Sequence, residues 1–188
     1  LPTTEYTYYN LNQSTPTLPG HLTVSQRVQS GQSTVLTVDT YADGLGNTLQ
    51  TRSPGENPGE YVVTGINLKD ARGQVIQQWV PYASNASGYL PITQEPNYTN
   101  LLFVTYAYDA MGRLTTLTDP DGSTSSLLYD KNQIGAIDAN GHLLWKTSDA
   151  RGQLVSVEEY TGSDGRNPMY PQTQFQLYST TSYAYDDL

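Results

Sequence analysis

One four-residue pattern, an aspartate followed three positions later by a glycine, recurs between strand-like runs along the chain. The aspartate suits the first position of a type I β-turn, because its carboxylate can accept a hydrogen bond from the backbone N–H two residues on. The glycine suits the fourth position, where a positive φ would strain a residue with a Cβ. The pattern predicts five pairs of structural turn residues: Asp43 and Gly46, Asp70 and Gly73, Asp109 and Gly112, Asp138 and Gly141, and Asp149 and Gly152.

The pattern is clearest in residues 106–129, where two turns separate three strand-like runs. Residues 108–114 read Tyr-Asp-Ala-Met-Gly-Arg-Leu, and residues 119–122 read Asp-Pro-Asp-Gly. Proline is pre-set for the second position of such a turn, and the leucines and threonines between the two turns favour an extended chain. This segment therefore predicts a unit of strand, turn, strand, turn and strand.

The rest of the chain repeats this design. We expect strands at residues 6–9, 22–29, 33–41, from 48 onward, 60–68, 75–80, 101–108, 134–137, 143–146, 155–160, 174–178 and 182–185. No stretch of eleven or more residues shows a helical period of apolar positions. The sequence therefore predicts an all-β fold of many short antiparallel strands joined by Asp-x-x-Gly turns.

The turn spacing also predicts how the chain is organised. Residues 1–39 are expected to form N-terminal strands, which could begin the repeat sheet, and residues 40–188 are expected to form the repeat region. Residues 82–100 contain several turn formers and are expected to be an irregular loop. Residue 1 is not an initiator methionine, and the last residues interrupt a Tyr-Asp repeat, so we expect a segment truncated at both ends.

Tyrosine supplies most of the aromatic area, with 16 tyrosines against 2 phenylalanines. A tyrosine can bury its ring against a sheet while its hydroxyl stays in water. Hydrophobic residues make up 36% of the chain. This composition favours a thin, well-solvated sheet over a thick, dry core.

Charge and cysteine content exclude several classes of function. The formal net charge is -9, and no basic patch could neutralise phosphates, so we expect no nucleic-acid partner. No apolar run is long enough to cross a membrane. The chain has no cysteine, which excludes disulfides, thiolate metal sites and cysteine nucleophiles. A surface rich in Thr, Ser, Gln, Asn and Tyr is typical of secreted or cell-surface bacterial proteins.

The turn segments resemble the YD repeat of the Rhs-repeat proteins. The similarity lies in residues 108–114, in the turns that begin at Asp138 and Asp149, and in residues 41–46 and 70–82. The last two segments are similar to the B components of bacterial insecticidal Tc toxins. Two turns depart from the pattern, because Lys69 and Ser148 stand where a tyrosine would precede the aspartate. The resemblance covers most of residues 40–188.

The resemblance implies a curved, spiralling strip of β-sheet that forms part of a hollow shell. In bacterial polymorphic toxins such a shell encloses a C-terminal toxin or effector, and the related teneurins use a similar shell in adhesion. The implied partners are the remainder of the shell and a C-terminal cargo domain. Because unpaired strand edges need cover, edge-to-edge self-association of the segment is a further expectation. The family's self-cleaving site lies in a segment for which we find no counterpart here.

A few histidines and acidic residues could in principle serve catalysis or calcium binding, but their sequence context favours structural roles. His21 and His142 leave a Ser-His-Asp arrangement open, but no Gly-x-Ser-x-Gly motif supports one. Asp-Gly turns near Asp121 and Asp164 could begin calcium loops, yet the EF-hand spacing is not met. The neighbours Glu158 and Glu159 would point to opposite faces of a strand and not converge on one bond.

The sequence therefore predicts a structural segment of an Rhs-type shell, with no catalytic residue, no cofactor and no metal site. The alternative is an exposed adhesion or carbohydrate-binding β module, with Trp79, Trp145 and the tyrosines as contact residues. An open aromatic face would favour this alternative. An enzymatic function is the least favoured hypothesis.

Overall fold

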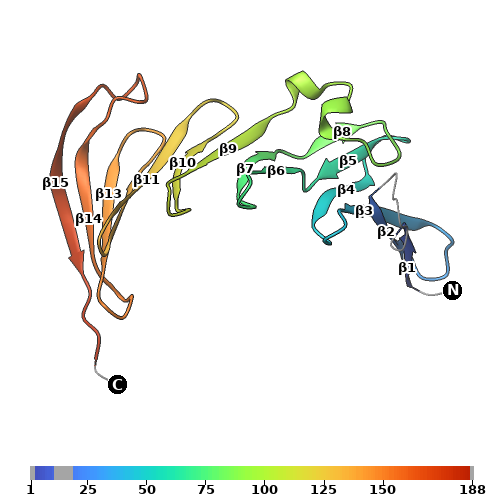
Figure 1. Ribbon diagram of the computed structural model, residues 1–188, viewed down its shortest axis with the longest axis horizontal. Coiled ribbons are helices and arrows are strands. Elements are labelled where there is room, and N and C mark those ends of the chain that lie inside the picture. Colours follow the sequence, from blue (N-terminus) through green and yellow to red (C-terminus); the bar gives the residue numbers. More distant parts are fainter. Residues whose placement is uncertain (1–2, 11–18, 187–188) are drawn as a thin grey trace. The chain divides into compact units, whose positions relative to one another are not determined.

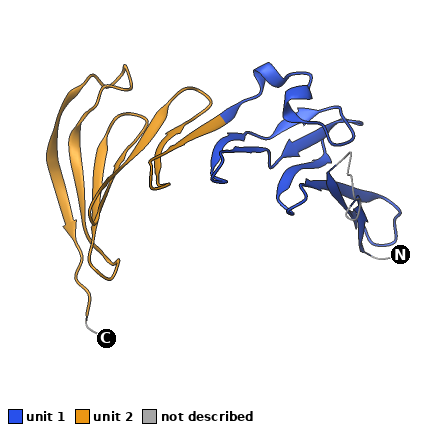
Figure 2. Ribbon diagram, in the orientation of Figure 1, with its two compact units in different colours: residues 1–103 blue, residues 104–188 orange. Residues whose placement is uncertain are grey.

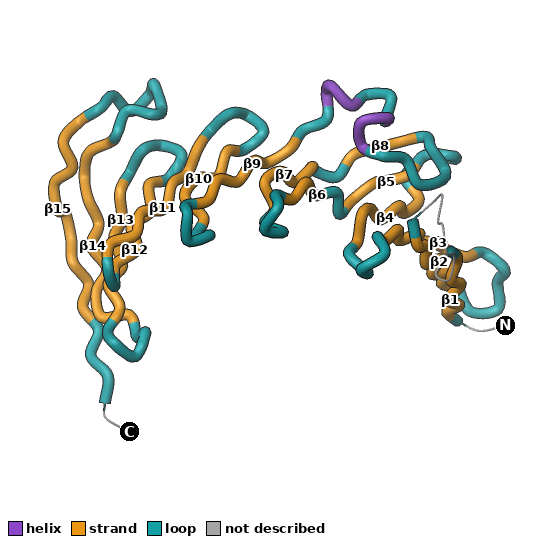
Figure 3. The backbone as a smooth tube through the Cα atoms, viewed as in Figure 1, coloured by secondary structure: helices purple, strands orange, loops and turns teal. Residues whose placement is uncertain are grey.

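The computed structural model describes residues 3–10 and 19–186 and divides into two compact units, residues 1–103 and 104–188 (Figure 2). Both units are built from short antiparallel strands, and in the described part of the chain helix is confined to two single 3₁₀ turns, drawn purple in Figure 3. The expected all-β fold with antiparallel strands is confirmed. Among the described residues, no helix is long and apolar enough to span a bilayer.

The first unit contains an antiparallel sheet of six strands in the order β1-β2-β3-β4-β5-β8 (Figure 1). Its strands are β1 (Thr4–Tyr9), β2 (Gly20–Arg27), β3 (Val35–Ala42), β4 (Thr48–Pro54), β5 (Tyr61–Thr64) and β8 (Tyr82–Ser84). The hairpin of β6 (Asn67–Lys69) and β7 (Val75–Trp79) and the 3₁₀ turns η1 (Ile92–Gln94) and η2 (Tyr98–Asn100) complete the unit.

The second unit is a meander in which each strand pairs antiparallel with the next one along the chain (Figure 1). Its strands are β9 (Phe103–Tyr108), β10 (Leu114–Thr118), β11 (Thr124–Asp130), β12 (Gln133–Ile137), β13 (Leu143–Ser148), β14 (Leu154–Ser163) and β15 (Thr173–Ser182). The first residue of β9 belongs to the first unit. This order follows from the short hairpin connections, which leave each strand beside its predecessor.

The observed strands differ from the expected ones in several places, among them the short strand β8, which lies within residues 82–100 where an irregular loop was expected. Residues 60–68 form two strands and not one, because Gly65 between them has a φ of 78°, which an extended strand does not adopt. Residues 174–178 and 182–185 were expected to be separate strands, but β15 runs unbroken from Thr173 to Ser182. The ten residues of β14 offer it a partner over its whole length, and two register shifts absorb the mismatch.

The apolar core is small. In the first unit Val63, Ile66 and Trp79 are buried together. In the second unit Ile137 and Leu143 are each 9% exposed. Many other large apolar side chains remain on the surface, which is the pattern that a tyrosine-rich single sheet predicts.

Candidate functional site

The turn between β9 and β10 shows the geometry of the repeated pattern. The Asp109 N–H donates to the Arg113 carbonyl at 2.9 Å, and the Gly112 N–H donates to the Asp109 carbonyl at 3.0 Å. Asp109 Oδ1 accepts the N–H groups of Met111 and Arg113 at 2.9 and 3.0 Å. Gly112 has a φ of 82°. This is a type I turn followed by a left-handed glycine, a hairpin connection whose twist suits the flanking strands.

The same geometry recurs at the other four aspartates. Each Oδ1 accepts the backbone N–H groups two and four residues on, at 2.8–2.9 Å. Each glycine has a φ between 80° and 86°. The structure thus places Asp43, Asp70, Asp138 and Asp149 at the first turn position and Gly46, Gly73, Gly141 and Gly152 at the fourth.

At three of the turns these hydrogen bonds also lower the pKa of the aspartate, namely Asp43, Asp109 and Asp138. The backbone N–H of Arg113 lowers the pKa of Asp109, and the side-chain amide of Asn47 does the same for the pKa of Asp43. At Asp138 burial acts to raise the pKa, but the hydrogen bonds from His142 outweigh it, and the pKa is lowered. These three carboxylates therefore stay charged and engaged with their own turns, which leaves them poor candidates for proton transfer.

The turn between β10 and β11 has the same backbone hydrogen bonds as the five Asp-x-x-Gly turns, but a different aspartate side chain accepts a turn N–H. Gly122, with a φ of 85°, donates its N–H to the Asp119 carbonyl at 2.9 Å. Here Asp121 Oδ1 accepts the Ser123 N–H at 2.8 Å. The described residues hold no group of three or more His, Cys, Asp or Glu side chains that could bind a metal ion.

A tyrosine closes the open end of the β10–β11 hairpin. The Tyr129 hydroxyl donates to the Leu114 carbonyl at 2.8 Å. The guanidinium carbon of Arg113 lies 4.2 Å from the centroid of the Tyr129 ring, while Arg113 Nε and Nη2 each lie 2.7 Å from Asp109 Oδ2. The turn, the arginine and the tyrosine therefore form one connected cluster.

The β14–β15 hairpin has the same closure. The Tyr185 hydroxyl donates to the Leu154 carbonyl at 2.8 Å. Leu154 and Leu114 are each the second residue after a turn glycine, and Tyr185 and Tyr129 each precede an aspartate. We name this arrangement the tyrosine closure. Our sequence reasoning missed it, although the combination of Gly-x-Leu with a later Tyr-Asp is a signal that could have found it.

Within the first unit, a buried ion pair joins residues 82–100 to strand β4. Arg52 Nη2 lies 2.5 Å from Glu95 Oε1, and the two side chains are 0% and 2% exposed. Arg52 Nε donates to Gln50 at 2.6 Å, and the Ser84 hydroxyl donates to Glu95 Oε2 at 2.8 Å. Burial, reinforced by Glu95, raises the pKa of Tyr82, whose hydroxyl donates to the same carboxylate. The sequence did not reveal this pair, because the partners lie 43 residues apart.

The first histidine lies in an aromatic stack across β1, β2 and β3. The His21 ring centroid is 5.1 Å from that of Tyr9 and 4.5 Å from that of Tyr41. His21 Nε2 lies 2.9 Å from Asp39 Oδ1 and 3.1 Å from the Thr23 hydroxyl. A catalytic triad needs the hydroxyl and the carboxylate on different ring nitrogens, and here both contact Nε2.

The remaining candidates serve the sheet or its turns. His142 Nδ1 lies 3.3 Å from Asp138 Oδ2 within one turn. Glu158 accepts the Tyr160 hydroxyl at 2.8 Å, whereas Glu159 accepts the hydroxyl of Ser179 on β15 at 2.9 Å. The two neighbouring carboxylates therefore have separate partners.

Both tryptophans are used for packing. Trp79 is 7% exposed and its ring centroid lies 5.6 Å from that of Phe103. Trp145 lies against Gly135, where an added Cβ would be 2.9 Å from the indole. Trp79 is therefore not available as a platform for a sugar ring, and Trp145 is half-buried.

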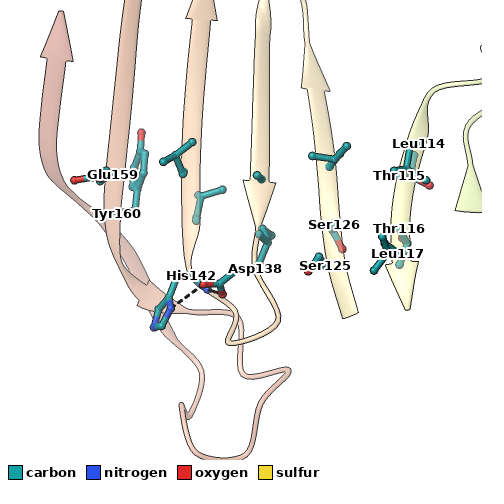
Figure 4. Close-up of a pocket in the computed structure, with 15 residues that line it drawn as sticks. Leu114, Thr115, Thr116, Leu117, Ser125, Ser126, Asp138, His142, Glu159 and Tyr160 are labelled. Atoms are coloured by element: carbon teal, nitrogen blue, oxygen red, sulfur yellow. Dashed lines mark hydrogen bonds and ion pairs between the residues drawn. The ribbon is translucent and has the colours of Figure 1, made fainter. Parts of the chain in front are cut away.

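The second unit has a groove of about 640 Å³ that crosses β10, β11, β12, β13 and β14 (Figure 4). Its lining includes a row of directly opposed residues, namely Leu127, Ala136, Leu144 and Glu159. Asp138 also lines it, beside its own turn. No lysine or arginine is among the lining residues of this described groove.

Comparison with known proteins gives one family match and several similar structures. The family model described as RHS Repeat matches residues 101–124, which contain the turns at Asp109 and Asp119. No curated protein matches the chain by sequence. Among solved structures, 26 chains match.

Three of the similar structures contain TcdB2-TccC3 or a Tc holotoxin. The crystal structure of TcdB2-TccC3 has a TM-score of 0.79 at 17% identity, and the match covers 98% of this chain and 10% of that one. The structure of TcdB2-TccC3 without its hypervariable C-terminal region has a TM-score of 0.71 at 18% identity, and the match covers 90% of this chain and 9% of that one. A mutant of the Photorhabdus luminescens Tc holotoxin pore has a TM-score of 0.73 at 17% identity, and the match covers 91% of this chain and 9% of that one. The chain thus spans about a tenth of the length of each.

The meander, the repeated turn and the tyrosine closure define a β-sheet protein built from sequence repeats. The RHS Repeat match over residues 101–124 supports the resemblance to the RHS-repeat, or YD-repeat, proteins, and the chain has the fold found in these Tc toxin structures. The resemblance inferred from the sequence is confirmed.

Proposed function

We propose that the chain is a non-catalytic segment of an RHS-type wall, which encloses a C-terminal toxin or effector in a large secreted bacterial protein. The supporting observation is that the hydrogen bonds which form each turn lie within that turn and its own two strands. A sheet of such self-contained hairpins can be lengthened by adding more of them, as a long wall requires. The proposal extends to the partners, which are the rest of the wall and the enclosed polypeptide.

The strand edges support a larger assembly. Within the described residues β1 pairs only with β2, and β15 pairs only with β14. A ten-residue edge strand such as β15 presents unpaired backbone groups that proteins usually cover. In the proposed wall, neighbouring parts of the sheet cover these edges, and in the isolated segment they promote self-association.

The turn residues have a structural role in this proposal. The five aspartates and their glycines set where each hairpin reverses, and their carboxylates hold the turn amides. Residues 40–188 form the repeat region, and residues 1–39 supply the strands that precede it.

Limited proteolysis of the full-length parent protein, read by mass spectrometry, tests the enclosure. We expect a long C-terminal polypeptide to survive intact while exposed loops are cut. Rapid digestion of that polypeptide, before the repeat region itself is cut, would show that the repeats do not enclose it.

A second candidate function is an exposed carbohydrate-binding surface. Tyr6 and Tyr8 lie two residues apart on β1, and each is 61% exposed, so their rings could contact a sugar. Titration of a panel of soluble oligosaccharides tests this function. Binding that is lost in the Tyr6→Ala and Tyr8→Ala variants would support it.

A further inference from the structure

We propose that Trp145 on β13 is the stacking platform of a binding site for a neutral oligosaccharide of pyranose units. The site lies on one face of the second unit and is completed by side chains in register with Trp145 and by the next row along the strands. The inference rests on the second candidate function, an exposed carbohydrate-binding surface, and gives it a site apart from the tyrosines of β1.

The indole of Trp145 lies with one face over Gly135 on the neighbouring strand. The two residues are directly opposed in the β12–β13 pair. A Cβ added to Gly135 would be 2.9, 3.0 and 3.1 Å from the indole carbons Cε2, Cζ2 and Cδ2. Cε2 and Cδ2 form the bond that the two rings share, so the glycine faces the middle of the indole and not its rim. A glycine at this position therefore lets the ring lie flat against the sheet.

The outer side of the indole is open. Among the described residues no aromatic ring stacks on Trp145, and its side chain is only half-buried. In the same part of the chain, Trp79 Nε1 is the one buried side-chain nitrogen or oxygen that lacks a hydrogen-bond partner. The Trp145 N–H has no partner among the described residues either, so it must reach water. The C–H face of a pyranose can stack on such a ring, which removes apolar surface of both from water.

The strand register places an apolar and an acidic side chain beside Trp145 on the same face. Leu128 on β11 is opposed to Gly135 and is 38% exposed. On the other side, Glu158 on β14 is opposed to Trp145. These side chains therefore form one row across four strands. The Glu158 carboxylate accepts the Tyr160 hydroxyl at 2.8 Å and has further acceptor positions for a sugar hydroxyl.

The next row along the strands is polar and lies on the same face, because side chains two positions apart on a strand share a face. The two rows are about 6.6 Å apart, which is within reach of a sugar stacked on the indole. Gln133 Nε2 donates to the Thr147 hydroxyl at 3.1 Å, and that hydroxyl can still donate to a ligand. The members of this row, each opposed to the next, are Asp130, Gln133, Thr147, Ser156 and Ser182.

The charges of this face favour a neutral ligand. Asp130 and Glu158 are the charged members of the two rows, and neither row contains a lysine or an arginine. Lys146 follows Trp145 directly and therefore points to the opposite face. Sulfated, phosphorylated or uronic-acid saccharides would be repelled. A simple cation would leave the amide and the hydroxyls unused, whereas a neutral pyranose chain matches both the flat ring and the polar row.

Tryptophan emission makes the site observable. In the Trp79→Phe variant Trp145 is the only tryptophan, and a sugar stacked on it should shift its emission to the blue by excluding water. The neutral probes are cellohexaose, xylohexaose and mannohexaose, and the charged probe is hexagalacturonate. We expect a saturable shift with at least one neutral probe and at least tenfold weaker binding of hexagalacturonate. Calorimetry with the unaltered chain should give the same dissociation constant.

Substitutions locate the binding, again by calorimetry. Trp145→Ala should weaken the best neutral probe at least tenfold, as loss of a central aromatic contact does. Gln133→Ala, which keeps the indole in place, should weaken it about threefold through a lost hydrogen bond. Lys146→Ala, on the opposite face, is the matched control and should leave the affinity unchanged.

The outcomes separate this site from the function on which it rests. Binding that is lost in Tyr6→Ala and Tyr8→Ala but kept in Trp145→Ala and Gln133→Ala would retain the carbohydrate-binding function and overturn the Trp145 site. Absence of saturable binding by every neutral probe would overturn both. An emission shift with tetramethylammonium and with none of the saccharides would identify a cation site and overturn the proposal.

Discussion

Replacing Glu95 with glutamine keeps the volume of the side chain but leaves the fully buried Arg52 guanidinium without its counter-ion. Removing one partner of a buried ion pair costs about 3–5 kcal/mol, because the other charge stays buried and unpaired. The glutamine NH₂ would also replace one of the two acceptor oxygens, so that either the Ser84 hydroxyl or the Tyr82 hydroxyl would face a donor. We expect the free energy of unfolding of the first unit to fall by about 3–5 kcal/mol, a large share of the total for a typical domain.

The two tryptophans make this measurement specific. Trp79 lies in the core of the first unit and Trp145 lies in the second, so urea unfolding of Trp145→Phe followed by fluorescence reports the first unit. Glu56→Gln, an exposed control of the same chemistry, should change the free energy by less than about 0.5 kcal/mol.

A double-mutant cycle completes the test. Arg52→Met combined with Glu95→Gln should be more stable than the sum of the two single changes predicts, by about 1–3 kcal/mol, because the orphaned charge is gone. A loss below about 1 kcal/mol for Glu95→Gln, together with additive single changes, would refute the reasoning that this pair holds residues 82–100 in place.

Three further changes test the hairpins, each by urea unfolding. Gly112→Val should destabilise by about 1–3 kcal/mol because its φ of 82° strains a β-branched residue, whereas Gly44→Val, with no positive φ and open space around it, should cost little. Tyr129→Phe should cost about 0.5–1.5 kcal/mol through the lost bond to a backbone carbonyl, and Tyr178→Phe, 75% exposed, should be neutral. Asp109→Asn should be less stable than the parent at pH 7. Since the folded pKa of Asp109 is lowered, its contribution is present above the ordinary value of 3.8 and is lost below it, so the difference should shrink as the pH falls through that range. A difference that is constant with pH would show that the charge of Asp109 is not involved.

The fold class could be predicted because its signals are local. A type I turn with a left-handed glycine is encoded within five residues, and most strands pair with a sequence neighbour, β5 with β8 being an exception. The break between β5 and β6 at Gly65 was not predicted, because the sequence around an isolated glycine in a strand-like run does not indicate whether its φ is positive. The continuity of β15 depended on the length of β14, which is a property of the pairing.

The long-range features could not be predicted. Arg52 and Glu95 meet only after β4 and the chain following β8 are folded. The row of directly opposed residues Leu127, Ala136 and Leu144 becomes visible only once the strand register is known. The tyrosine closure lies between these extremes, because its residues recur in sequence while their contact depends on the hairpin.

The proposed enclosure is tested most directly by the accessibility of the two sheet faces in the parent protein. Leu128 and Ile134 lie on neighbouring strands but on opposite faces, since Ile134 pairs with the residue after Leu128, and they are 38% and 47% exposed. The segment contains no cysteine, so single cysteines at these positions in a cysteine-free parent can be labelled with a bulky polyethylene-glycol maleimide. If the segment is part of an enclosing wall, one of the two positions should react rapidly and the other should be protected, while both should react in the isolated chain. Equal, rapid labelling of both positions in the parent would contradict the account.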